Sequence, residues 1–348
     1  MIEYIVGGIT AVLLAGAAYQ VLGVRRDRRR FPPLGKYVQL STHRLHYQDM
    51  GEGGPTVVLE SGLMSTMLTW HGLQPELAKS TRVICYDRAG FGWSDPGPEP
   101  RNAERIVEEL RELLRRVEAP PPYVLVGHSF GGLTMHLFAA RYSHEVCGVV
   151  LVDPVAAGEW RPASERDLHR VAIGAKICRR AAALSYTGLI RATAALVQSG
   201  AKGAANPLIR AISKGAPSDS NSTESPWFWN LPASERDMAP IFWTQPKFCR
   251  AIASQLERLP ESAEQVIAAG RLNKPLVVIS GGNASPRRLA EHRAIAEESP
   301  NGRHIIADRS GHWITEDQPE LVIGAILDFV ELARGVGTAG STRVGNVR

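Results

Sequence analysis

The sequence predicts an α/β fold in which a mostly parallel sheet is flanked by helices, with a helical insertion and one apolar N-terminal helix. The main observation is a repeating pattern. Short apolar, β-branched runs alternate with runs of helical periodicity over residues 36–154 and again over residues 271–334. This alternation is typical of parallel strands whose connecting helices cover both faces of a sheet. About 300 residues are ample for one large core with an insertion.

The N-terminus predicts a membrane helix over residues 4–24. Ile5–Val24 is interrupted only by Thr10 and Gln20, and it is long enough to cross a bilayer. Five arginines follow at once in a basic linker, residues 25–35. A secretory signal peptide carries its positive charges before the apolar run, which is the reverse order. By the positive-inside rule we expect a single-pass membrane protein whose main domain is cytoplasmic.

The basic character of the chain is concentrated at its ends. The net charge is +5, but residues 1–36 contribute +4 and the tail, residues 335–348, contributes +2. The core between them is therefore close to neutral and has no electrostatic footprint for a phosphate backbone, which excludes nucleic acid as an expected partner. The arginines beside the apolar helix fit anionic lipid headgroups better. The Gly-, Ser- and Thr-rich tail is predicted to be flexible.

The cysteines and histidines give no sign of a metal site. The four cysteines have no paired spacing, and no His/Cys/Asp cluster has the spacing of metal ligands. A Gly-rich phosphate loop is absent from the sequence as well. We therefore expect reduced cysteines, in agreement with a cytoplasmic domain, and no cofactor.

The core elements are expected in a regular order. A strand pair at the sheet edge is followed by two strands with a helix between them. A helix over Ala103–Val117 has apolar residues at helical spacing and ends before three prolines. The expected strands are Lys36–Leu40, Arg44–Asp49, Thr56–Glu60, Arg82–Asp87, a run that begins at Tyr123, Val149–Val152, Pro275–Ser280 and 303–307, and the first helix lies around Trp70–Ser80.

One strand runs directly into a Gly-x-Ser-x-Gly pattern. Ser129 lies between Gly127 and Gly131, and a helix-forming run follows. This layout places the serine on a tight strand-to-helix turn, where its hydroxyl is exposed near the free N–H groups of the helix. Glycines are needed there because the backbone passes close to itself. The alternative is a glycine-rich connecting loop.

A nucleophilic serine needs a base, and His312 is the best candidate. It lies on a short polar loop just after the last strand, so it can reach the carboxyl edge of the sheet where Ser129 is expected. The alternative is an ordinary surface histidine. Asp153 ends a buried strand at the same edge and is the candidate for orienting the imidazole, although it could simply fix a turn before Pro154. Glu291 is the first acid after the next strand and the main rival.

Two further segments show a family resemblance. Leu59–Ser65 resembles the oxyanion loop of the α/β-hydrolase fold family, and Cys85–Ser94 resembles its Asp-Arg-x-Gly-x-Gly-x-Ser segment. The resemblance covers residues 36–334 and implies a triad in the order Ser, Asp, His. Two features depart from the common pattern: Ser61 stands where many members have histidine, and the acid follows the sixth strand instead of the seventh.

An oxyanion hole is expected beside the serine. The residue after the nucleophile, Phe130, would supply one N–H, and the resemblance puts the second at Leu63. Arg88 and its neighbours are interpreted as structural residues that hold the loop after the fourth strand, and direct contact of Arg88 with substrate is the alternative.

The insertion, residues 155–270, resembles a cap over the active site. Its aromatic residues either line a pocket for an acyl or alkyl group or pack the cap onto the core. They are Trp227, Phe228, Trp229, Phe242 and Trp243.

These features together predict a membrane-anchored serine hydrolase that cleaves a carboxylic ester or a related acyl compound. The expected partners are a small acyl substrate, which membrane anchoring suggests is lipophilic, and the membrane itself. Families of the same fold with an aspartate nucleophile are disfavoured because Ser129 occupies the turn. An amidase, peptidase, thioesterase, C–C bond hydrolase or acyltransferase remains open, as does a non-catalytic protein that uses its cap for binding.

Overall fold

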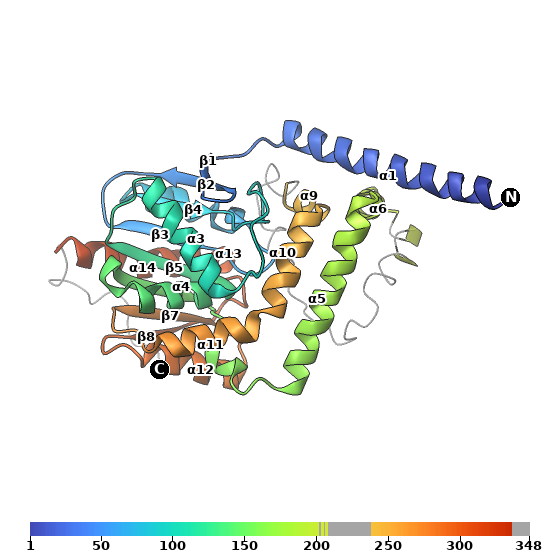
Figure 1. Ribbon diagram of the computed structural model, residues 1–348. Coiled ribbons are helices and arrows are strands. Elements are labelled where there is room, and N and C mark those ends of the chain that lie inside the picture. Colours follow the sequence, from blue (N-terminus) through green and yellow to red (C-terminus); the bar gives the residue numbers. More distant parts are fainter. Residues whose placement is uncertain (202, 205, 208–237, 336–348) are drawn as a thin grey trace.

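The computed structural model describes residues 1–201, 203–204, 206–207 and 238–335. An eight-stranded sheet forms the centre of the molecule, with helices on both sides (Figure 1). Its strands are β1 Lys36–Gln39, β2 Arg44–Met50, β3 Thr56–Glu60, β4 Val83–Tyr86, β5 Tyr123–His128, β6 Val146–Val152, β7 Leu276–Gly281 and β8 Arg303–Ala307.

The strand order is β1-β2-β4-β3-β5-β6-β7-β8. Strand β2 pairs antiparallel with β1 and β4, and all the other pairs are parallel. The predicted mostly parallel sheet is thus confirmed, with the predicted strand pair at its edge. Because the parallel strands point the same way, the residues that follow β5, β6 and β8 meet along one edge.

Both faces of the sheet are buried, and alternate residues along a strand enter different cores. In β5, Leu125 packs into one apolar cluster, whereas Val124 and Val126 pack into the other. This explains why the strands are continuous apolar runs and do not alternate with polar residues. The flanking helices are α2 Gln74–Ala78, α3 Ala103–Arg116, α4 Phe130–Arg141, α11 Leu259–Ala269, α12 Pro286–Ala296, α13 Ile314–Asp317 and α14 Pro319–Ala333, with short 3₁₀ turns η1 Met67–Trp70, η2 Ser143–Glu145 and η3 Ala157–Trp160.

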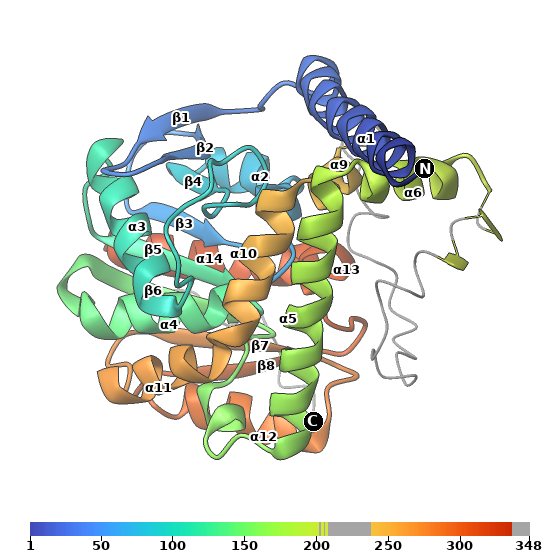
Figure 2. The same cartoon turned by 45° about the vertical axis from the view of Figure 1, so that its right-hand side comes forward.

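The insertion between β6 and β7 forms a layer beside the sheet edge. Its described helices are α5 Glu165–Tyr186, α6 Leu189–Gln198, α9 Ala239–Trp243 and α10 Pro246–Glu257. Helices α5 and α10 run side by side (Figure 2). The last helix before β7, α11, packs against α3 and α4 and so covers the sheet. Trp227, Phe228 and Trp229 lie outside the described residues.

The N-terminal helix, α1 Ile2–Arg30, is longer than predicted. The sequence prediction ended it at residue 24, but the helix continues through the arginines. Arginine is a good helix former, and the chain reaches its first helix-breaking residues only at Pro32 and Pro33. The N-terminal part of α1 projects from the rest of the molecule (Figure 1). Of the tail that was predicted to be flexible, residues 336–348 lie outside the described part of the chain.

Candidate active site

Ser129 lies on the sharp turn between β5 and α4. Its backbone angles, φ 55° and ψ −118°, are unusual for a residue with a side chain and cost about 1–3 kcal/mol. A Cβ atom at Gly127 would clash with the carbonyl of Gly131, and one at Gly131 would clash with the carbonyl of Glu60. The two glycines are therefore required by close backbone contacts on either side of the serine.

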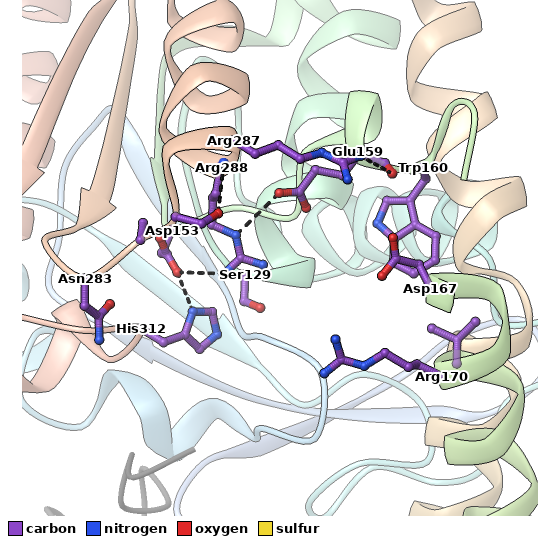
Figure 3. Close-up of a pocket in the computed structure, with 13 residues that line it drawn as sticks. Ser129, Asp153, Glu159, Trp160, Asp167, Arg170, Asn283, Arg287, Arg288 and His312 are labelled. Atoms are coloured by element: carbon purple, nitrogen blue, oxygen red, sulfur yellow. Dashed lines mark hydrogen bonds and ion pairs between the residues drawn. The ribbon is translucent and has the colours of Figure 1, made fainter. Parts of the chain in front are cut away.

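His312 and Asp153 come together from two strand ends. The Nδ1 atom of His312 lies 2.5 Å from Oδ2 of Asp153, and the backbone N–H of Gly281 donates to Oδ1 of Asp153 at 3.2 Å. The His312 side chain retains 26% of its exposure, whereas that of Asp153 retains 3%. Figure 3 shows the imidazole next to Ser129 in the same cavity.

The surroundings of Asp153 favour its ionised form. Burial acts to raise its pKa, but the hydrogen bond with His312 and the charges of His312 and Arg288 outweigh burial and hold the pKa below its usual value. Nη1 of Arg288 lies 3.8 Å from Oδ2 of Asp153. The carboxylate of the rival acid, Glu291, lies instead against Gly158.

His128 packs against His312 and bonds to its backbone. The centroid of its ring lies 4.6 Å from that of His312, with the two ring planes tilted by 43°, and its Nε2 lies 2.9 Å from the carbonyl oxygen of His312. Burial and the nearby His312 lower the pKa of His128 to about 3. His128 is thus neutral at pH 7, and its Nε2–H donates to that carbonyl.

The loop after β3 lies directly against Ser129. A Cβ atom at Gly62 would be 3.1 Å from Cβ of Ser129. The buried Arg88 side chain donates to the carbonyls of Ser61 and Gly62, each at 2.5 Å, and pairs with Glu60 at 2.7 Å. Arg88 therefore fixes the loop that carries Leu63, in agreement with its structural interpretation. On the other side of the serine, Phe130 begins α4, so its N–H has no partner within the helix.

A cavity of about 710 Å³ is lined by Ser129, Asp153 and His312, among other residues. The residues that the insertion and α12 contribute to its wall were not predicted from the sequence. Arg170 comes from α5, and Arg288 comes from α12, where it lies 3.5 Å from Glu159 (Figure 3). Trp243 is not among the described lining residues and packs, partly buried, with an apolar core cluster. Within the described residues, no group of three or more His, Cys, Asp or Glu side chains is placed to hold a metal ion.

Comparison with known proteins identifies one family. The model of the alpha/beta hydrolase fold matches residues 55–319. The chain is 36% identical over 104 residues to the uncharacterized protein YqjL of Bacillus subtilis (strain 168), covering 30% of this chain and 41% of that protein. It is 33% identical over 125 residues to the 2-hydroxy-6-oxo-2,4-heptadienoate hydrolase of Pseudomonas putida, covering 35% of this chain and 45% of that protein. These matches span less than half the length of either relative.

Solved structures with the same fold extend over most of the chain. A thermophilic esterase from Thermogutta terrifontis, solved with malate bound, superposes with a TM-score of 0.59 and 24% identity. The superposition covers 87% of this chain and 100% of the esterase chain. At this level of identity the similarity shows the fold.

Proposed function

This chain belongs to the alpha/beta hydrolase fold family, and we propose that it is a serine hydrolase that cleaves a carboxylic ester or a related acyl compound. One observation carries the proposal. His312 is paired with a buried carboxylate, that of Asp153, at 2.5 Å and shares its cavity with a serine on a strained turn. A nucleophile, a base and a group that orients the base are the parts that acyl transfer needs.

The proposed reaction has two halves. Ser129 Oγ attacks the carbonyl carbon while His312 Nε2 takes the hydroxyl proton, and the tetrahedral intermediate collapses as His312 returns the proton to the leaving alcohol. Water then attacks the acyl-enzyme, with His312 again acting as base, and releases the acid and free Ser129. Asp153 accepts the Nδ1–H of His312 and stabilises the imidazolium that forms twice in each cycle.

We further propose that the N–H groups of Phe130 and Leu63 bind the oxyanion. The free first turn of α4 supplies the former, and the loop held by Arg88 supplies the latter. Two preorganised donors at this position lower the barrier by several kcal/mol, on the order of 3 kcal/mol each. Because both groups are main-chain, Leu63→Ala is expected to change the rate little.

A second candidate activity is hydrolysis of a C–C bond. It is favoured by the partial similarity to a 2-hydroxy-6-oxo-2,4-heptadienoate hydrolase. The same serine, histidine and aspartate would serve, so only the substrate would differ. Parallel assays with an ester series and a vinylogous diketone would separate these two activities.

The N-terminal helix supports a proposal of membrane anchoring. Helix α1 is long and apolar enough to cross a membrane, and only 6% of its most apolar window is buried. By the positive-inside rule, the arginines at its C-terminal end favour a cytoplasmic location for the hydrolase domain. The proposed substrate is a small acyl compound. A substrate drawn from the membrane would be lipophilic.

The nucleophile is tested with a fluorophosphonate probe on the full-length protein in detergent micelles, beside Ser129→Ala. Labelling of the Ser129 peptide, located by mass spectrometry and absent from the variant, is the expected result. A folded protein that is not labelled would contradict the proposal and favour a non-catalytic binding protein.

A further inference from the structure

Helix α1 is held against the cap along one face. Gly16, Gln20, Gly23 and Asp27 are spaced by four, three and four residues, so they form one stripe along the helix. A Cβ atom at Gly16 would clash with the carbonyl of Thr187 at the end of α5, and one at Gly23 would clash with the side chain of Arg191. The two glycines therefore allow α1 to pack closely against the cap at these two positions.

Polar side chains lock this contact. Gln20, which is 5% exposed, donates to the carbonyl of Thr244 at 2.9 Å. Arg191 of α6 donates to Gln20 Oε1 at 3.1 Å and to Thr244 Oγ1 at 3.1 Å, and it pairs with Asp27 at 2.6 Å. Asp27 is the single acid within the run of arginines, and its ion-pair partner, Arg191, lies 164 residues away along the chain. Such a network fixes one arrangement of α1 on the cap because each group would lose its partners in another.

The docked arrangement leaves too little free helix to cross a bilayer. The first residue packed against the cap is Gly16, so the projecting part is Ile2–Ala15. At about 1.5 Å per residue these 14 residues reach about 21 Å, whereas the hydrocarbon core is about 30 Å thick. A full crossing therefore requires the cap beside Gly16 to enter the membrane by roughly 9 Å. This depth matches that of helices that lie at the boundary between headgroups and acyl chains, about 5–10 Å.

The cap helix next to this contact, α6, has a surface suited to the boundary between lipid headgroups and acyl chains. Helix α6 packs beside α1, close to where the free part of α1 leaves the domain (Figures 1 and 2). Its only charged residue is Arg191, which turns to α1. Leu189, Leu196 and Val197 remain 36–39% exposed, and Tyr186 at the end of α5 is 56% exposed.

We propose that α1 and α6 act as one membrane-binding unit, in which α6 is immersed at the boundary of an anionic phospholipid bilayer that α1 crosses. The exposed arginines at the end of α1 would then meet the anionic headgroups. This inference rests on the proposed membrane anchor. It adds that the cap is held against the membrane in a fixed orientation by the Gln20–Arg191–Asp27 network and is not tethered by a free linker.

Depth-dependent fluorescence quenching tests the inference. An environment-sensitive dye is attached in turn at Leu196→Cys on α6, Val12→Cys on α1 and Glu108→Cys, an exposed control position on α3. Cys147→Ser and Cys178→Ser remove the two native thiols that are not buried. The full-length protein is placed in phosphatidylcholine–phosphatidylserine vesicles whose lipids carry a quencher near the headgroup or at the centre of the acyl chain.

Each outcome decides one point. We expect strong quenching at residue 196 by the shallow quencher, at residue 12 by the deep quencher, and none at residue 108. Quenching at residue 12 without quenching at residue 196 would overturn immersion of α6 and leave the anchor intact. No quenching at residue 12 would mean that the anchor proposal itself fails, and this inference with it.

A matched pair of arginine variants tests the role of the docking network. Arg191→Ala removes the contacts with α1, whereas Arg179→Ala removes an ion pair with Glu257 that lies within the cap. We expect Arg191→Ala to lose most of the quenching at residue 196 and to keep that at residue 12, and Arg179→Ala to keep both. Equal quenching in the two variants would show that the network does not position the cap. Probe labelling of Ser129 confirms that each variant is folded.

Discussion

At the scale of single residues, Asp153 differs in its surroundings from the other acids near the cavity. It is almost fully buried, accepts hydrogen bonds from Gly281 N and His312 Nδ1, and has Arg288 3.8 Å away. An ionised carboxylate in this position can hold the imidazole in one tautomer and stabilise its charged form. The neutral amide in Asp153→Asn would keep the shape and lose both effects.

Asp153→Asn is therefore expected to lower kcat/KM for ester hydrolysis by as much as about 10⁴-fold. Glu291→Gln is the matched control, because Glu291 is the rival acid and lies against Gly158. Steady-state hydrolysis of a chromogenic ester measures both variants. A large loss in Glu291→Gln with little change in Asp153→Asn would reassign the acid.

His128 gives a prediction about pH. Its pKa is lowered to about 3 in the folded protein and is close to 6.5 in the unfolded chain. Between these values the unfolded chain binds a proton that the folded protein does not, so stability falls as the pH decreases. Well above pH 6.5, His128 is neutral in both states and does not lower the free energy of unfolding. On going from pH 7 to pH 5, its protonation in the unfolded chain lowers the free energy of unfolding by about 2 kcal/mol.

Urea unfolding of the wild type and His128→Gln at both pH values measures this effect. The variant is expected to lose about 2 kcal/mol less than the wild type over this range. An identical pH dependence in the two proteins would contradict the lowered pKa of His128.

At the scale of elements, the turn between β5 and α4 depends on backbone contacts that no side-chain substitution can relieve. Gly131 lies at the start of α4 against the carbonyls of Glu60 and Ser61 in β3 and the following loop. The same contact therefore sets the turn that carries Ser129 and the approach of the loop that carries Leu63.

Gly131→Ala is expected to destabilise the protein by about 1–3 kcal/mol, because its methyl group would overlap buried backbone, and to abolish labelling of Ser129. Gly324→Ala is the control, since Gly324 lies in the interior of α14 with open space around it. Alanine at that helix position is expected to stabilise by about 0.5–1 kcal/mol. Chemical denaturation and probe labelling measure both. Normal labelling of Gly131→Ala would contradict the role of the close contact.

At the scale of the whole molecule, the proposed catalytic residues and the proposed membrane-binding unit belong to different layers. Ser129, Asp153 and His312 follow strands of the central sheet, whereas α1 contacts helices α5 and α6 of the insertion. Within the described residues, the hydrogen bonds that hold Asp153 and His312 come from the sheet and its loops and not from α1.

A chain that begins at Lys36 is therefore expected to label at Ser129 at nearly the same rate as the full-length protein and to lose its association with vesicles. Its cap is expected to be less stable, because Arg191 and Gln20 would no longer hold each other. Probe kinetics, vesicle flotation and hydrogen exchange measure these three properties. A large drop in labelling would show that α1 supports the site through the cap.

The sequence by itself determined the features that depend on local pattern. Alternating apolar runs specify the parallel sheet, and the glycines around Ser129 specify its turn, because backbone geometry there tolerates no other residue. The positions of Asp153 and His312 at strand ends follow from the rule that parallel strands share one carboxyl edge. For this reason the fold and the residues of the proposed triad could be predicted before any coordinates.

Only the tertiary structure decided which distant side chains meet. Nothing local to Arg170 or Arg288 indicates that one faces the cavity and the other lies beside Asp153, because helix periodicity shows a face but not its neighbour. The pairing of Asp27 with Arg191 joins segments 164 residues apart. Local sequence fixes backbone conformation, but contacts between layers depend on how the insertion packs on the sheet and on α1, and that packing is set by the whole chain.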